Sequence, residues 1–204
     1  MRIGGFQKVS FIDFPETIAS VVFTQGCNWR CPWCHNPRLV YADQFEDPIP
    51  EALILEYLKS RIGQVEGVVV SGGEPTLHTD LGEFMGNIRK LGLKTKLDTN
   101  GSHPEHLKTL LDANLLDYVA MDIKSAPESY NRLTGVKIDM TKIVRSINLI
   151  QQSNIAHEFR TTRVPHLHSK EDFVGIKKLI GELDCIRIQE FAKAGVSMDS
   201  ANCK

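Results

Sequence analysis

Three of the five cysteines in this 204-residue chain, Cys27, Cys31 and Cys34, lie close together in the segment FTQGCNWRCPWCHNP at residues 23–37. Thiolates are soft ligands that suit zinc, copper(I) or an iron–sulfur cluster. A structural zinc ion takes four protein ligands, and His35 is the nearest candidate for the fourth, although the side chains of adjacent residues diverge. Three cysteines can instead hold three corners of a four-iron cluster and leave one iron for a non-protein ligand. The spacing, taken with the motifs below, favours an iron–sulfur cluster over structural zinc.

Two further motifs follow predicted strands and carry polar groups. SGGEP at residues 71–75 is by itself a tight turn before a helix, because glycine supplies backbone freedom and proline favours a helix start. In the functional interpretation, Gly72 and Gly73 let a ligand approach the backbone, and Glu74 places a carboxylate beside a bound ammonium group. DTNG at residues 98–101 is equally weak alone, since Asn-Gly is a common turn.

The motif MDIK at residues 121–124 combines an acid and a base. Asp122 and Lys124 are two apart on a predicted strand and therefore lie on the same face. A buried ion pair is the structural interpretation of this spacing. The position at a strand end favours contact with a ligand.

The elements that must position these motifs alternate regularly along the chain. Apolar runs rich in β-branched residues predict strands at 18–24, 67–71, 94–98, 117–124, 157–164 and 185–190. Apolar residues three and four apart predict helices at 50–62, 78–92, 104–115, 139–153 and 169–183.

This alternation implies a parallel sheet covered by helices, either an open doubly wound sheet or one that curves towards a barrel. The units are fewer than those of a full eightfold barrel. We therefore expect an α/β fold that forms a partial (β/α)6 barrel with mostly parallel strands. Ligand sites of such folds gather at the carboxyl ends of the strands, so the cysteine segment, SGGEP, DTNG and MDIK are expected to meet at one rim.

Composition sets the broad class. Apolar residues make up 42% and charged residues 24%, which is typical of a globular protein, and nothing justifies dividing residues 1–204 into more than one domain. The formal net charge of -1 argues against a nucleic-acid binder. The chain shows neither an apolar run of membrane-spanning length nor a signal-peptide core. The clustered cysteines with their odd total suit a reducing compartment, so we expect a cytoplasmic protein.

The motifs together resemble a known family. Cys27-x-x-x-Cys31-x-x-Cys34, with Trp33 before the third cysteine and followed by SGGEP, DTNG and MDIK, resembles the radical S-adenosylmethionine (SAM) enzymes. More narrowly, the chain resembles the activating enzymes of glycyl-radical proteins. The opening KVSFIDFPETIASVVFTQGCNWRCPWCHNP is similar to that of the anaerobic ribonucleoside-triphosphate reductase activating proteins.

The resemblance implies roles for individual residues. The three cysteines would ligate a [4Fe–4S] cluster, and the methionine part of S-adenosylmethionine would chelate the open iron. Trp33 would pack near the adenine, while Gly72, Gly73 and Glu74 would receive the methionine amino group. Asp98, Thr99 and Asp122 would help to hold a monovalent cation near the methionine carboxylate. Lys124 and Arg160 would be cationic contacts to the cofactor, and Asn100 would be a further cofactor contact.

The implied activity is reductive cleavage of S-adenosylmethionine to a 5′-deoxyadenosyl radical. That radical would generate a glycyl radical on a partner, anaerobic ribonucleotide reductase, with flavodoxin or ferredoxin as the electron donor. A radical enzyme acting on a small molecule such as a deazapurine precursor is the alternative within the same chemistry. A zinc-stabilised interaction module or an electron carrier is the alternative of another class. Cys185 is expected to be a small buried side chain, and Cys203 and the scattered histidines receive no role.

Overall fold

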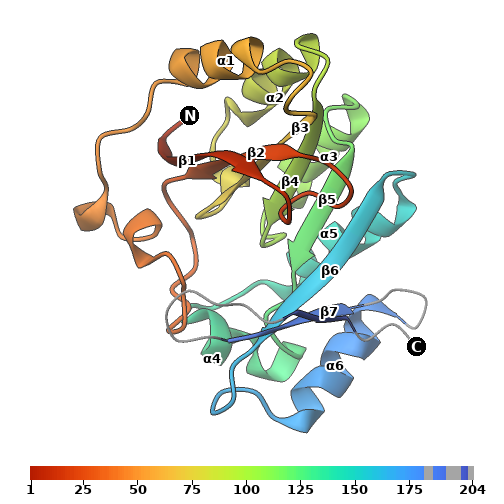
Figure 1. Cartoon of the computed structure of the whole chain (residues 1–204). Helices are drawn as coiled ribbons and strands as arrows, with labels where there is room; N and C mark the ends of the chain where they lie inside the picture. Colours follow the sequence, from red (N-terminus) through yellow and green to blue (C-terminus); the bar gives the residue numbers. More distant parts are fainter. Residues whose placement is uncertain (182–185, 192–198, 202–204) are drawn as a thin grey trace.

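One curved sheet forms the centre of the protein (Figure 1). The computed structural model describes residues 1–181, 186–191 and 199–201. Within these residues the strands are β1 Ile3–Ser10, β2 Ala19–Thr24, β3 Gly67–Gly72, β4 Lys94–Thr99, β5 Tyr118–Asp122, β6 Ala156–Arg163, β7 Ile186–Glu190 and β8 Asp199–Ala201. Their order in the sheet is the order of the chain, from β1 to β8.

The strand order distinguishes a barrel from a doubly wound sheet. Strands β2 to β7 are parallel to one another, whereas β1 pairs antiparallel with β2 and β8 pairs antiparallel with β7 at the two edges. A doubly wound sheet reverses its strand order at a switch point, and this sheet does not. Right-handed crossovers that always step in one direction place their helices on one face of the sheet. The predicted partial (β/α)6 barrel is therefore confirmed.

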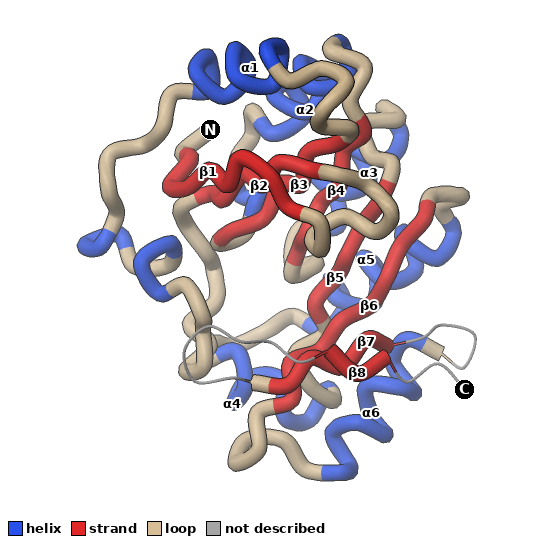
Figure 2. The backbone as a smooth tube through the Cα atoms, viewed as in Figure 1, coloured by secondary structure: helices blue, strands red, loops and turns tan. Residues whose placement is uncertain are grey.

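The barrel is not closed. β1 and β8 are the outer strands of the sheet and do not pair with each other. Figure 2 shows β1 beside β2 in the upper part of the molecule and β7 with β8 in the lower part. Within the described residues, the sheet is therefore curved but not joined edge to edge.

Helices connect the parallel strands. The α-helices are α1 Glu51–Ser60, α2 Leu81–Lys90, α3 Pro104–Asp112, α4 Tyr130–Thr134, α5 Met140–Gln152 and α6 Lys170–Ile180. Short 3-10 turns are η1 Pro37–Leu39, η2 Ala42–Gln44, η3 Pro75–Leu77 and η4 Pro127–Ser129. None of the helices within the described residues is long and apolar enough to cross a membrane.

The main core lies between the sheet and these helices. Helix α2 shows the pattern, because Leu81, Phe84, Met85 and Ile88 are all fully buried and lie on one stripe of the helix. Burial of each such side chain contributes about 1.5–3 kcal/mol. Helix α6 begins with a capping box, in which the hydroxyl of Ser169 accepts the backbone N–H of Asp172 and the Asp172 carboxylate accepts the backbone N–H of Ser169.

Some elements were not predicted from the sequence. Strand β1 was missed because IGGFQKVS contains two glycines and three polar residues and lacks a continuous apolar run. It gains its pairing from β2, with which it forms the antiparallel edge. Helix α4 has only five residues, and its apolar pattern is too short to detect.

Candidate active site

A cavity of about 320 Å³ opens at the carboxyl ends of the parallel strands. Each of the four motifs contributes to its wall, as predicted from the strand-end rule. The predicted site residues that line it are Cys27, Cys31, Trp33, Cys34, Gly72, Gly73, Glu74, Asp98, Thr99, Asn100, Asp122, Lys124 and Arg160. The sequence therefore identified residues that the fold does bring together, although their individual roles stay predictions.

The three thiols are half-buried, and none forms a disulfide. Burial raises the pKa of the Cys27 thiol to about 12, even though the backbone N–H of Trp29 donates to its Sγ at 3.4 Å. Burial also raises the pKa of the Cys31 thiol, and the nearby Lys124 ammonium opposes this shift. A metal that binds such thiols displaces their protons and converts them to thiolates.

Long-range backbone contacts hold the cysteine loop in place. Gly26 N–H donates to Leu39 O at 2.7 Å, and Arg30 N–H donates to Thr134 O at 2.8 Å. At Gly135, with φ of 71°, an added Cβ would lie 2.3 Å from the Arg30 carbonyl oxygen. The loop therefore packs tightly on the end of α4.

The glycines of SGGEP serve chain packing. An added Cβ on Gly72, with φ of 114°, would lie 2.3 Å from the backbone nitrogen of Thr24. A Cβ on Gly73 would lie 2.0 Å from the carbonyl oxygen of Gly26. From the sequence, we expected these glycines to allow close approach by a ligand. The structure shows a different reason for them, because the backbone at the end of β3 lies against the backbone at the end of β2.

We expect Gly73→Ala to destabilise the protein strongly, because the methyl group overlaps a backbone atom that cannot move without shifting the cysteine loop. The loss should be at least that of a typical overpacked site, about 1–3 kcal/mol. Urea unfolding followed by circular dichroism measures it. Gly86→Ala is the matched control, since Gly86 lies within α2 and its nearest contact is Leu115 at 3.9 Å. That control should gain about 0.5–1 kcal/mol of helix propensity, and equal stability of both variants would contradict the packing role.

Glu74 joins SGGEP to DTNG. Its side chain is fully buried, and its carboxylate accepts hydrogen bonds from Thr76 N–H at 3.1 Å, the Thr99 hydroxyl at 2.7 Å and Asn100 N–H at 2.7 Å. Burial raises the pKa of Glu74, and these hydrogen bonds partly counter the shift. The carboxylate thus already has partners within the protein. Its contact with a ligand ammonium group stays a prediction.

A chain of amide contacts joins the cysteine loop to DTNG. Asn100 Nδ2 donates to Asn28 Oδ1 at 2.9 Å, and Asn28 Nδ2 donates to the Ser102 hydroxyl at 2.9 Å. Sequence reasoning missed Asn28, whose only signal is its position between the first two cysteines. The cysteine loop, SGGEP and DTNG therefore form one hydrogen-bonded unit.

Charged side chains from three strand ends form a second unit in the cavity. The Asp122 carboxylate lies 3.1 Å from Lys124 Nζ and 3.0 Å from Arg160 Nε. Arg160 Nη1 also lies 3.4 Å from Asp98 Oδ2. Burial alone would raise the pKa of Asp122, but Arg160 and Lys124 outweigh it and hold that pKa below its usual range. Asp122 is therefore a carboxylate, and the predicted ion pair with Lys124 lines the cavity.

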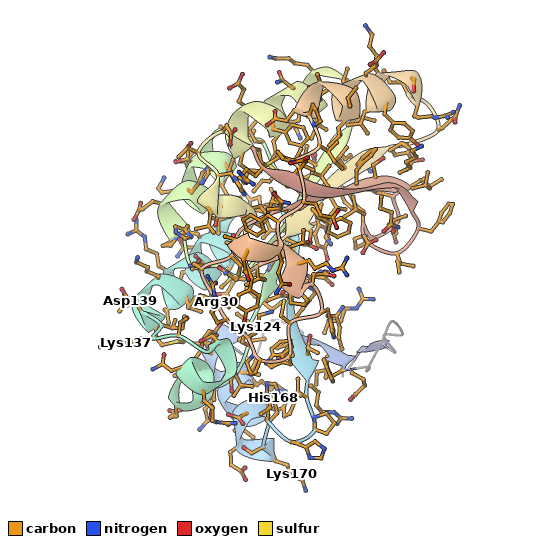
Figure 3. The ribbon with its side chains drawn as sticks, turned by 90° about the vertical axis from the view of Figure 1, so that its left-hand side faces the viewer. Arg30, Lys124, Lys137, Asp139, His168 and Lys170 are labelled. Atoms are coloured by element: carbon orange, nitrogen blue, oxygen red, sulfur yellow. The ribbon has the colours of Figure 1, made fainter. Side chains whose placement is uncertain are left out.

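Lys124 lies two residues beyond the end of β5 and is held there by its neighbours. Its ammonium lies over the Trp33 ring, 5.0 Å from the ring centroid. The ring of His168 accepts Val164 N–H at 3.1 Å on one side and donates to the Lys124 carbonyl oxygen at 2.8 Å on the other (Figure 3). Trp33 is 8% exposed and packs with Leu133. His168 therefore has a structural role at the site.

The zinc alternative required His35 as the fourth ligand. The His35 ring stacks on Phe191, with centroids 5.2 Å apart and planes 11° apart. Within the ranges that the structure describes, no three His, Cys, Asp or Glu side chains form a group suited to a single metal ion. Cys185 and Cys203 lie outside the described residues.

A curved parallel sheet with polar and thiol side chains gathered at its strand ends is the architecture of α/β barrel enzymes. Residues 21–180 match the family model of the radical SAM superfamily. The match covers more than half of the chain, which therefore belongs to this superfamily. Its members use a [4Fe–4S] cluster and S-adenosylmethionine.

Individual relatives narrow the comparison. A protein of Methanocaldococcus jannaschii named "Putative glycyl-radical enzyme activating enzyme" is 33% identical over 195 residues, which are 93% of this chain and 79% of the relative. The pyruvate formate-lyase-activating enzyme of Listeria monocytogenes is 32% identical over 145 residues, which are 65% of this chain and 57% of that enzyme. This chain thus spans less than two thirds of the second relative.

A solved structure shares the fold. Streptococcus suis SuiB, crystallised with S-adenosylmethionine, superposes with a TM-score of 0.68 over 85% of this chain and 40% of SuiB. The sequence identity is 14%, so the similarity concerns the fold alone.

Proposed function

We propose that this radical SAM enzyme generates a glycyl radical on a partner protein, and that the partner is an anaerobic ribonucleoside-triphosphate reductase. The single observation that carries the activase role is the similarity to the M. jannaschii relative, which extends over 93% of this chain. The choice of reductase as the partner rests on the resemblance of residues 8–37 to the activating proteins of that enzyme.

The residues of the cavity fit the two cofactors of the family. Three half-buried thiols that line one wall are the donor set of a cluster with one open iron. The ammonium of Lys124 and the guanidinium of Arg160 line the same cavity and are suited to a carboxylate. When bound, the cluster and S-adenosylmethionine supply the one-electron chemistry that produces a 5′-deoxyadenosyl radical.

The protein's own residues fix the walls of the cavity in which the cofactors would lie. The hydrogen-bonded unit of the cysteine loop, SGGEP and DTNG fixes one side of the cavity, and the Asp122 ion pairs fix the other. The ring of buried Trp33 covers one side of the Lys124 ammonium. A radical that must attack one C–H bond needs such fixed geometry, because a displacement of the reacting groups by 1 Å is costly in rate.

A sheet that is not closed into a full barrel suits a protein substrate. A glycine in a partner's loop must reach the cavity while it remains part of its own chain, and the edge strands β1 and β8 do not pair with each other within the described residues. An electron donor such as flavodoxin or ferredoxin completes the reaction, because each turnover consumes one electron.

Electron paramagnetic resonance tests the proposal. The reduced enzyme should cleave S-adenosylmethionine slowly alone and should leave a persistent radical on the reductase when the two proteins are mixed. We expect a doublet from the glycine Cα–H coupling, which collapses when that carbon is deuterated. One 5′-deoxyadenosine should form per activated glycine, because the radical stays on the partner.

Cys34→Ala enzyme is the matched control and should give no radical, since it lacks a cluster ligand. Many turnovers of a small metabolite without any protein radical would contradict the proposal. That result would favour the small-molecule alternative.

A further inference from the structure

Lys96 is a buried cation that the proposed reaction does not explain. It lies on β4 two residues before Asp98, so both side chains leave the same face of the strand. The Lys96 side chain is 2% exposed, and lysine is almost never fully buried unless it is paired. Its ammonium must therefore have partners.

Its partners join two segments of the cavity wall. Lys96 Nζ lies 2.9 Å from Asp98 Oδ1, which is ion-pair distance without hydrogen-bond geometry, and it donates a hydrogen bond to the Asp13 carbonyl oxygen at 2.6 Å. Asp13 belongs to the loop between β1 and β2, and both Asp13 and Asp98 line the cavity. The Asp13 carboxylate accepts the hydroxyl of Ser10 at 2.5 Å. Lys96 thus lies behind the cavity wall and positions Asp13 and Asp98, which line the cavity.

The carboxylates at this wall are already paired, and the cations around them are one more in number. Asp98 pairs with Lys96 and Arg160, and Asp122 pairs with Arg160 and Lys124. Two carboxylates therefore face three cations at ion-pair distance. Glu158 of β6 adds a third carboxylate, 4.0 Å from Lys96 and 3.5 Å from Arg187 of β7, whose guanidinium adds a fourth cation.

A monovalent metal cation does not fit this arrangement. The family resemblance places such an ion beside Asp98, Thr99 and Asp122. The carboxylates of Asp98 and Asp122 already form ion pairs with side-chain cations. A metal cation would lie beside these positive charges, and solvent and salt screen the repulsion only weakly at a buried site. The arrangement of charges therefore argues against the expected monovalent cation.

We propose that the Lys96 ammonium takes the place of a monovalent metal cation, positions Asp98 and Asp13, and makes binding of S-adenosylmethionine independent of potassium and sodium. This inference rests on the proposed cofactor site. It does not depend on the identity of the partner protein. Lys96 is a positioning residue, because it acts on the cofactor through Asp98 and the loop that contains Asp13.

Cation binding to the wild-type holoenzyme tests the proposal directly. Thallium(I) is a probe for potassium sites, and equilibrium dialysis with S-adenosylmethionine present should show no stoichiometric thallium on the protein. The affinity for S-adenosylmethionine should change by less than about twofold when choline replaces potassium at constant ionic strength, because no bound metal ion is lost. One bound thallium that potassium displaces would overturn the proposal, as would a larger loss of affinity in choline.

Lys96→Met removes the charge and keeps the length of the side chain. In choline, we expect its affinity for S-adenosylmethionine to fall about tenfold, because the ion pair with Asp98 and the charge-assisted hydrogen bond to the Asp13 carbonyl oxygen are both lost. Potassium or ammonium should restore most of the affinity, and about one thallium should bind. Lys94→Met on the exposed start of the same strand is the matched control and should behave as wild type.

Other outcomes also decide the question. If Lys96→Met does not fold, the wild-type thallium and choline results still stand as the test. If Lys96→Met loses affinity and no monovalent cation restores it, the claim that the Lys96 ammonium takes the place of a metal cation is wrong. None of these measurements needs the partner, so failure to form a glycyl radical leaves them unaffected. Absence of S-adenosylmethionine binding by the wild type would overturn this inference together with the proposed cofactor site.

Discussion

Alanine at Cys27, Cys31 or Cys34 should abolish iron binding by the anaerobically reconstituted protein. The wild type should bind about four irons and show a brown chromophore that air bleaches, because a four-iron cluster with three protein ligands exposes one iron. Each substitution removes one of three ligands, and the cavity wall offers no other described cysteine. Iron and sulfide analysis together with the visible absorption spectrum measure the loss.

The remaining two cysteines supply the controls. Cys185→Ala and Cys203→Ala lie outside the cluster of three and should keep the full iron content. Stoichiometric zinc with no uptake of iron by the wild type would show that the thiols serve a structural metal ion. In that case the radical mechanism could not operate in this chain.

Lys124→Ala should weaken S-adenosylmethionine binding roughly 10- to 100-fold, which corresponds to about 1.5–3 kcal/mol for a charge-assisted hydrogen bond. The Lys124 side chain is 14% exposed, and its ammonium is fixed by Asp122 and the Trp33 ring. It is thus oriented before a ligand arrives, so little entropy is lost when the ligand binds. Isothermal titration of the reconstituted enzyme measures the affinity, and the iron content should not change.

Two further measurements separate a ligand contact from a purely structural ion pair. Lys137→Ala, at an exposed lysine after α4, is the matched control and should bind S-adenosylmethionine normally. Urea unfolding of Lys124→Ala reports on the fold. A variant that unfolds, or one that is destabilised yet binds with unchanged affinity, would show that Lys124 only neutralises Asp122.

The sequence predicted the barrel because its parallel strands are locally recognisable. Val68, Val69 and Val70 of β3 are fully buried, and such apolar runs are typical of strands covered on both faces. The position of the motifs at strand ends then followed from the general geometry of parallel sheets. Strand β1 lacks this signal, since its place depends on pairing with β2.

The finer chemistry of the site depends on contacts between distant segments. No local pattern indicates that Asn28 bonds to Asn100, or that Lys96 reaches the carbonyl oxygen of Asp13. Gly73 was assigned to ligand approach because its neighbour across the turn, Gly26, cannot be identified from the sequence. Each of these facts requires knowledge of which strand ends lie side by side.

The backbone contacts of the cysteine loop tie the spacing of its three thiols to distant parts of the chain. Gly26 is bonded to Leu39 and Glu74, and Arg30 is bonded to Thr134, so the loop rests on the end of β3 and on α4. The distances between the three sulfur atoms therefore depend on the packing of β3 and α4 as well as on the sequence of the loop itself.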